Sequence, residues 1–178
     1  ETSAKEEISS SMNTFIEAFC RKDRKVKLTN EYKVNFMNKE GDTVAKSEGE
    51  KLLVSLSFVS SLIKLAGERV SDPKKYLVNG ATAPLLIDAP FGKLDKDYKK
   101  STCEHLPESS EQLILLISSS HWEGIENILK GKIGKQWALI NNSEKANGPN
   151  DIIKVNNKEI SLAKYKQKAD FTSVQELI

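Results

Sequence analysis

The sequence has few of the side chains that build metal centres and disulfides. Its two cysteines, Cys20 and Cys103, lie far apart and match no zinc-binding spacing, and its two histidines, His105 and His121, form no cluster. Two cysteines without a secretory context favour reduced thiols in a reducing compartment. We therefore expect a cytoplasmic protein without a disulfide framework or a structural zinc site.

Long apolar runs and an excess of one charge are also missing. No apolar stretch reaches the roughly 18–20 residues that a membrane helix needs, so we expect no membrane partner. The 27 basic and 25 acidic residues nearly balance, which gives no global sign of nucleic-acid binding. The polar, acidic start Glu1–Glu7 is not a signal peptide, and because it lacks a methionine we interpret the chain as a piece of a longer one.

Two short apolar runs form the centre of the sequence. Leu85–Ile87 lies between a proline and a charge and predicts a buried parallel strand, and Gln112–Ile117 predicts a second one. Because a helix is expected between them, over 95–105, the two strands should pair in parallel through a right-handed crossover. The strands end on polar side chains, which are Asp88 on the first and Ser118, Ser119 and His121 on the second. The carboxyl edge of such a sheet is where α/β folds bind ligands, although an aspartate can also end a strand by chance.

A polar segment before a long apolar helix is the second feature. Ser47-Glu48-Gly49-Glu50 precedes the apolar stretch 52–66, which predicts a mostly buried helix. The free backbone N–H groups at such a helix start can bind an anion. The same residues also fit a capping box between Ser47 and Glu50, with no ligand involved.

The remaining segments complete an α/β pattern. We predict a helix over 3–24, which is either an ordinary amphipathic helix or the end of a coiled coil, with the charged residues 21–25 solvated at its end. Further predictions are a strand over 31–37, a surface loop over 67–82, a short helix over 122–129, a strand over 136–140, a hairpin of 151–155 with 159–164, and a fraying tail from 167.

Two motifs in this pattern resemble those of a known family. Asp88-Ala89-Pro90-Phe91-Gly92-Lys93-Leu94-Asp95 resembles the Walker B and D-loop octet of ABC-type ATPases. Ser47-Glu48-Gly49-Glu50-Lys51 resembles the signature motif of SMC-type ATPases, and the two occur in the family's order. The resemblance covers residues 3–140, and the octet is most similar to that of the ATPase subunit of DNA phosphorothioation (Dnd) systems and related defence and repair ATPases.

The resemblance implies an architecture and a set of partners. The implied fold is α/β, the C-terminal half of an ABC ATPase head, with a parallel sheet flanked by helices and a C-terminal hairpin. Residues 1–25 would be a helix at the root of a coiled coil, and 26–178 the lobe itself. The implied partners are the Walker A half of the same protein, a second head in an ATP-bound dimer, and DNA through the full complex.

The resemblance also implies roles for single residues, with ATP and Mg²⁺ as cofactors. Asp88 would hold the magnesium ion. Ser47 and Gly49 would reach the γ-phosphate of an ATP bound by the other head. Glu48 and Glu50 would belong to the same nucleotide-binding motif, and Asp95 would communicate across the dimer. Ser118, Ser119 or His121 would be the catalytic switch residue beside the γ-phosphate.

Two departures from the family pattern limit the expected activity. Ala89 stands where the family usually has the glutamate that activates water, and alanine cannot do acid–base work. The phosphate loop Gly-x-x-x-x-Gly-Lys-Ser/Thr is absent, since Gly131–Lys135 lacks its spacing, so this chain alone should not hydrolyse ATP. The leading hypothesis is part of an ATPase acting in DNA modification, repair or anti-phage defence. The alternatives are a nucleotide-gated dimerisation module with little turnover, and an unrelated α/β domain whose motifs coincide by chance.

Overall fold

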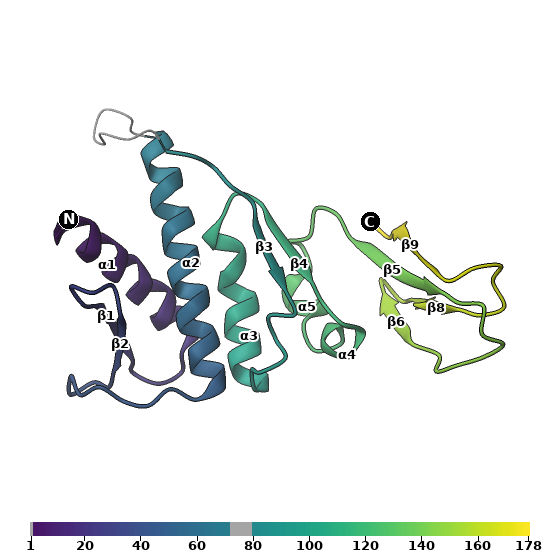
Figure 1. Ribbon diagram of the computed structural model, residues 1–178, viewed down its shortest axis with the longest axis horizontal. Helices are drawn as coiled ribbons and strands as arrows, with labels where there is room; N and C mark the ends of the chain where they lie inside the picture. Colours follow the sequence, from purple (N-terminus) through teal and green to yellow (C-terminus); the bar gives the residue numbers. More distant parts are fainter. Residues whose placement is uncertain (1, 72–79) are drawn as a thin grey trace. The chain divides into compact units, whose positions relative to one another are not determined.

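The chain folds into two compact units, Glu1–Leu116 and Ile117–Ile178, which are described separately. The computed structural model describes residues 2–71 and 80–178, and Figure 1 labels their helices and strands. The predicted division after residue 25 concerns the root of a coiled coil and stays a prediction.

The first unit is built around two helices and a small hairpin. Helix α1 (Thr2–Phe19) packs against helix α2 (Glu48–Ser71) and against β1 (Lys25–Leu28), which pairs antiparallel with β2 (Val34–Met37). The apolar residues of α1 recur at helical spacing, so they share the face that is buried. The core cluster draws on α1, the hairpin and α2, and consists of Met12, Ile16, Val26, Phe36 and Val54.

Helix α2 begins earlier and ends later than its apolar stretch predicts. Leu53, Val54 and Leu56 are buried, but Val59 and Leu62 are each 41% exposed, so the helix is less buried than expected. Its other buried positions are Glu50 and three serines, among them Ser57 and Ser61, whose hydroxyls donate to backbone carbonyls of the helix itself. The predicted loop over 67–82 starts within this helix, and its residues 72–79 lie outside the described part of the chain.

The parallel pair expected from the two apolar runs is present. Strand β3 (Leu85–Asp88) pairs in parallel with β4 (Leu113–Leu116), with Asp88 opposite Leu116. They are connected by α3 (Lys96–His105) and a 3₁₀ turn, η1 (Leu106–Ser109). The expectation that both strands are buried is wrong, because Leu86, Ile114 and Leu116 are 60%, 37% and 42% exposed.

The second unit contains two one-turn helices and β ladders that are mostly antiparallel. The predicted helix over 122–129 is divided into α4 (Ser119–Trp122) and α5 (Glu126–Leu129). Strand β5 (Trp137–Asn142) pairs antiparallel with β9 (Phe171–Glu176) and in parallel with β8 (Ala163–Lys164). The expected fraying from 167 onward is therefore wrong, since β9 forms a six-residue ladder.

A hairpin extends from this unit. Strand β6 (Ile152–Val155) pairs antiparallel with β7 (Lys158–Ser161) around Asn156 and Asn157. Both asparagines have positive φ, 49° and 65°, which is the backbone of a type I′ hairpin turn.

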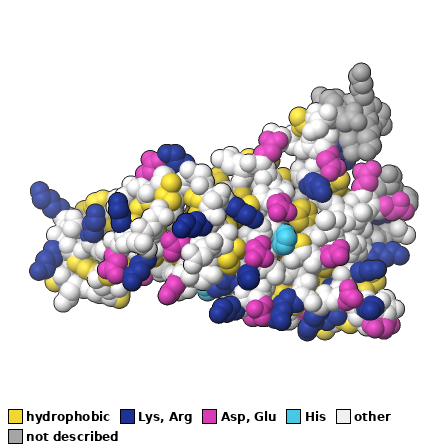
Figure 2. Space-filling view, turned by 180° about the vertical axis from the view of Figure 1, so that it is seen from behind, with side chains coloured by type: hydrophobic (Ala, Val, Ile, Leu, Met, Phe, Trp, Pro, Cys, Tyr) yellow, Lys and Arg dark blue, Asp and Glu magenta, His cyan; other side chains and the backbone are white. Residues whose placement is uncertain are grey.

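The surface shows the charge balance of the composition. On the face seen in Figure 2, basic side chains are interspersed with acidic ones. Over the described ranges 2–71 and 80–178, the chain has no helix with the length and apolar character of a membrane span.

Candidate functional site

The end of β3 places Asp88 at a sharp turn of the backbone. The Ala89 N–H donates to the Leu116 carbonyl at 2.9 Å, so the ladder runs one residue past Asp88. Ala89 itself has φ +48°, a left-handed conformation that is uncommon for a residue with a β-carbon. The side chains of Asp88 and Ala89 are exposed, which leaves the Asp88 carboxylate open to solvent at the carboxyl edge of the pair.

The loop after this turn is anchored by apolar side chains. Phe91 and Leu94 are 1% and 8% exposed, and Pro90 is fully buried, whereas Gly92 and Lys93 face solvent. Burial at both ends of the loop fixes its path from the strand towards α3.

This loop contacts the start of α2. A β-carbon placed on Gly49 would lie 3.1 Å from the Lys93 carbonyl oxygen and 3.5 Å from Leu94 Cδ2, so the backbones approach closely. The Lys93 ammonium also lies 3.3 Å from Glu48 Oε2. The structure thus brings together the two segments that carry the sequence motifs, 47–50 and 88–95.

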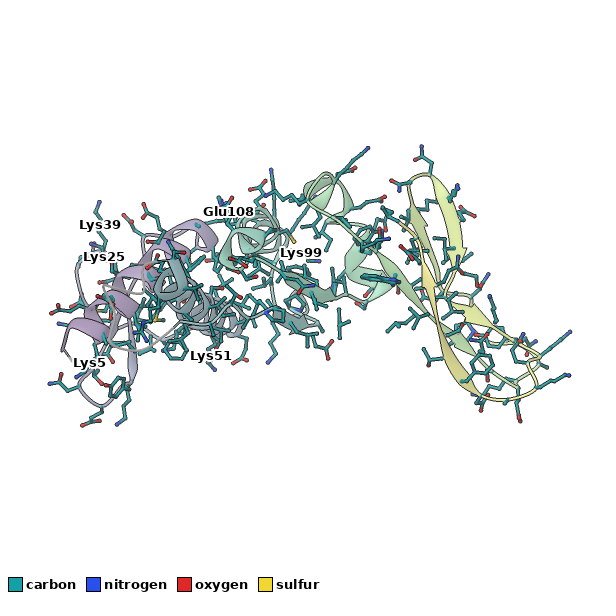
Figure 3. All side chains as sticks on the ribbon, turned by 90° about the horizontal axis from the view of Figure 1, so that it is seen from above. Lys5, Lys25, Lys39, Lys51, Lys99 and Glu108 are labelled. Carbon is teal, nitrogen blue, oxygen red and sulfur yellow. The ribbon has the colours of Figure 1, made fainter. Side chains whose placement is uncertain are left out.

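The capping box predicted for α2 is confirmed. The Ser47 N–H donates to Glu50 Oε2 at 2.9 Å, and the Glu50 N–H donates to Ser47 Oγ at 3.2 Å. Burial raises the pKa of the Glu50 carboxyl, but hydrogen bonds from Ser47 and Arg24 outweigh it and hold the pKa below its ordinary value. Lys51, labelled in Figure 3, marks this first turn and pairs with Glu48. Ser47 and Glu48 remain exposed, so they are accessible to a ligand.

Arg24 also contacts the start of α2, although the sequence predicted that residues 21–25 are solvated. Its Nε lies 3.4 Å from Glu50 Oε1, and the two side chains are only 19% and 7% exposed. No local pattern gives this contact, because Arg24 and Glu50 are separated by 26 residues.

Asp95 ends the anchored loop and begins α3. Its carboxylate accepts from the N–H groups of Asp97 and Tyr98 at 3.1 and 2.9 Å, so it is the N-cap of the helix. A role across a dimer interface stays a prediction for this exposed side chain.

The predicted switch residues all lie in the second unit. Ser118 precedes α4 without a side-chain cap, and its hydroxyl lies 3.0 Å from that of Ser120. The Ser119 hydroxyl donates to Asp151 Oδ2 at 2.8 Å, and His121 lies within α4, whose N-cap position is Ser118. The Ser119 hydroxyl thus already has a hydrogen-bond partner in Asp151. The switch role of all three residues stays a prediction.

The carboxylates of the first unit fit a nucleotide-bound Mg²⁺ better than a metal ion held by protein ligands alone. In the part of the chain that the structure describes, no three His, Cys, Asp or Glu side chains gather into a metal cage. Mg²⁺ bound to a nucleotide needs only one or two protein carboxylates, because phosphates and water supply its other ligands. The exposed carboxylate of Asp88 fits such a magnesium ion.

Known structures share this fold at low sequence identity. The chain matches no family model and no curated protein. A structure from a study of ATP-driven dimerization and DNA-stimulated activation of SMC ATPases matches 99% of this chain and 87% of its own, with a TM-score of 0.55 and 16% identity. The fold resembles that of SMC head domains.

Two further structures agree with this. The Smc head of Pyrococcus furiosus, with an extended coiled coil and bound to the C-terminal domain of ScpA, matches 78% of this chain at a TM-score of 0.51 and 17% identity. An Smc head bound to the C-winged helix domain of ScpA matches 99% at a TM-score of 0.52 and 15% identity. This chain covers only 33% and 44% of those two chains. At such identities the similarity concerns the fold, and it assigns no residue.

Proposed function

We propose that this chain is the C-terminal lobe of an SMC-like ABC ATPase head and binds ATP with Mg²⁺ between two heads. In this role Asp88 holds the magnesium ion, and Ser47 and Gly49 meet the γ-phosphate of the ATP on the opposite head. Asp95 faces the dimer interface, and Ser118, Ser119 or His121 senses the phosphate. Residues 1–25 lead from a coiled coil.

One observation carries the proposal, which is the contact between the two motif segments in a fold like that of SMC heads. Gly49 packs directly on the Lys93 carbonyl, and Lys93 reaches back to Glu48. A glycine is suited to this position, because a β-carbon would lie only 3.1 Å from the Lys93 carbonyl oxygen and the loop would have to shift by a few tenths of an ångström. The loop that follows Asp88 therefore packs on the helix start that carries Ser47 and Gly49.

This chain has no phosphate-binding loop, and it also leaves strands β3 and β4 partly uncovered. Among the described residues β3 and β4 pair only with each other, and their exposed side chains include Leu86, Ile114 and Leu116. An isolated two-stranded sheet is marginal in water. We infer that a half of the same protein bearing the Walker A loop covers these strands and completes the ATP site.

The biological role is proposed from the octet 88–95, whose form is most similar to that of Dnd-type and related SMC-like ATPases. The full complex would act on DNA in modification, repair or anti-phage defence. Nucleotide binding would gate the pairing of heads, and catalysis would consist of positioning and charge neutralisation.

A second candidate is a nucleotide-gated dimerisation module with little turnover. Ala89 favours it, because no side chain at this position can activate water. The left-handed backbone at Ala89 also turns the chain immediately after Asp88, where a longer side chain would have to adopt the same strained conformation.

Substitution of Asp88 in the full-length protein tests the magnesium assignment. Asp88→Ala should abolish most Mg²⁺-dependent ATP binding and hydrolysis, measured with a labelled nucleotide and by phosphate release. Asp97→Ala, an exposed carboxylate of the same unit, is the matched control and should change neither. Unchanged Mg²⁺-dependent binding in Asp88→Ala would show that this carboxylate holds no ion.

Substitution of Ala89 separates the two candidates. Ala89→Glu should raise turnover if the site is that of a slow ATPase, or trap an ATP-bound dimer that chromatography resolves. If neither turnover nor dimerisation changes, position 89 is remote from the phosphates.

A further inference from the structure

A short segment between α1 and β1 contacts the starts of two helices at once. Arg21 forms an ion pair with Asp97 in the first turn of α3, and Arg24 forms one with Glu50 in the first turn of α2. These are the helices whose caps are Asp95 and Ser47. Two arginines three residues apart therefore connect the end of α1 to both helix starts of the candidate site.

The two ion pairs differ in their environment. The Arg21 and Asp97 side chains are each 59% exposed, so solvent screens their attraction and the pair contributes little. The Arg24 and Glu50 side chains are 19% and 7% exposed. Removing the guanidinium would leave the Glu50 carboxylate buried with one partner fewer, which is costly. Of the two ion pairs, the buried one between Arg24 and Glu50 is therefore the one that can affect the start of α2.

A continuous set of contacts leads from α1 to the Ser47 hydroxyl. Phe36 packs in the core with Met12 and Ile16 of α1, and the Arg24 guanidinium lies over its ring, 5.7 Å from the centroid. Arg24 then meets one oxygen of Glu50, while the other oxygen accepts the Ser47 N–H at 2.9 Å. The orientation of the Ser47 hydroxyl is fixed in turn by the Glu50 N–H.

We propose that Arg24 is a positioning residue that couples the placement of α1 to the orientation of Ser47. A shift of α1 against α2 moves the Phe36 ring and the guanidinium with it, and so loosens the capping box. This proposal rests on the proposed function in one respect, which is that the Ser47 hydroxyl contacts a nucleotide. The contacts themselves exist without one.

Hydrogen exchange of the full-length protein tests the contact. In Arg24→Met, which keeps an unbranched side chain but removes the guanidinium, amide exchange in peptides covering 46–52 should become roughly tenfold faster, as expected from loss of one charge-assisted hydrogen bond. Arg21→Met is the matched control and should leave these peptides unchanged, and Arg24→Lys should restore part of the protection. Equal exchange in Arg24→Met and wild type, or an equal effect of Arg21→Met, would overturn the proposal.

ATP-dependent association of the same full-length variants tests the consequence. Arg24→Met should weaken association several-fold, Arg21→Met should not, and Ser47→Ala should weaken it at least as much as Arg24→Met. If Ser47→Ala weakens association and Arg24→Met does not, the positioning role is wrong. If neither variant changes association while the exchange effect is present, the coupling stands and the nucleotide function proposed for Ser47 fails.

Discussion

The core around α1 in the first unit and the β5–β9 ladder in the second differ in how far their apolar side chains are buried. Around α1 the first unit buries Met12, Ile16 and Phe36 to 1% exposure or less. One face of the β5–β9 ladder in the second unit leaves Leu139 and its direct partner Val174 58% and 65% exposed. Helix α2 thus packs against a buried core, whereas one face of the β5–β9 ladder is open to solvent.

The largest contrast should appear in thiol reactivity. Burial raises the pKa of the Cys103 thiol to about 12, and this is the main cause. Because the thiolate is the reactive form, a pKa three units above the ordinary value lowers the labelling rate roughly a thousandfold at pH 8. Reaction of the folded Cys20→Ser variant, in which Cys103 is the one remaining thiol, with a coloured disulfide reagent measures this rate.

A cysteine placed on the exposed ladder is the control for that experiment. Val174→Cys adds a thiol at a position that is 65% exposed, and it should react at the rate of a free cysteine. Rapid labelling of Cys103 in the native protein would show that the core of the first unit opens readily.

Leucine truncation should give the next largest difference. Leu53→Ala in α2 removes a side chain with 0% exposure and should destabilise the first unit by about 2–5 kcal/mol. Leu139→Ala, at 58% exposure, should change stability by less than about 0.5 kcal/mol.

Chemical denaturation with two probes measures both leucine variants. Both tryptophans, Trp122 and Trp137, lie in the second unit, so their fluorescence follows that unit while the helical circular dichroism follows mainly the first. A similar loss of stability in the two variants would mean that a further surface covers Leu139.

Two serines allow a finer comparison of the helix caps. Ser47→Ala breaks a capping box and should cost about 1 kcal/mol in the first unit. Ser118→Ala should cost less than about 0.5 kcal/mol, because Ser118 makes no side-chain cap to α4. Thermal unfolding of the two variants gives the difference, and a cost at Ser118 equal to that at Ser47 would contradict it.

The smallest effect should be a change in acid sensitivity. The pKa of Glu50 is lower in the folded chain than in the unfolded one, so the carboxylate stabilises the fold above its unfolded pKa. That contribution is lost as the pH falls through the lower folded pKa. When the pH is lowered from about 5 towards acid unfolding, the free energy of unfolding should therefore fall less in Glu50→Gln than in wild type.

The second unit supplies the control for this pH dependence. The pKa of Asp170 is also lowered, mainly by the Glu144 N–H and then by the Ser143 hydroxyl. Because Asp170 is exposed, Asp170→Asn should flatten the acid dependence less than Glu50→Gln does. Denaturant midpoints measured across this pH range decide between the two.

Much of the first unit could be predicted from local pattern. Helical spacing in 3–24 predicted α1, and the Ser-x-x-Glu pattern predicted the capping box at Ser47. The two apolar runs predicted a parallel pair because a helix separates them. In each case the signal lies within a few residues of the feature itself.

The errors concern contacts between segments that are distant in the sequence. Strand β9 is mostly polar, and it is a strand because β5, some thirty residues earlier, supplies its partners. The buried position of Arg24 depends in the same way on Glu50 and Phe36. The exposure of Leu86 was missed because an apolar run reads the same whether or not a partner covers it.

The uncovered parallel pair has a consequence for the protein in the cell. Leu85–Asp88 and Leu113–Leu116 are apolar apart from Asp88, and apolar strands with exposed, unpaired edges can pair with other chains and aggregate. We expect chains that are synthesised without a covering partner to precipitate or to be held by chaperones. The strand that ends at the candidate magnesium ligand is therefore also a principal solubility risk of the chain.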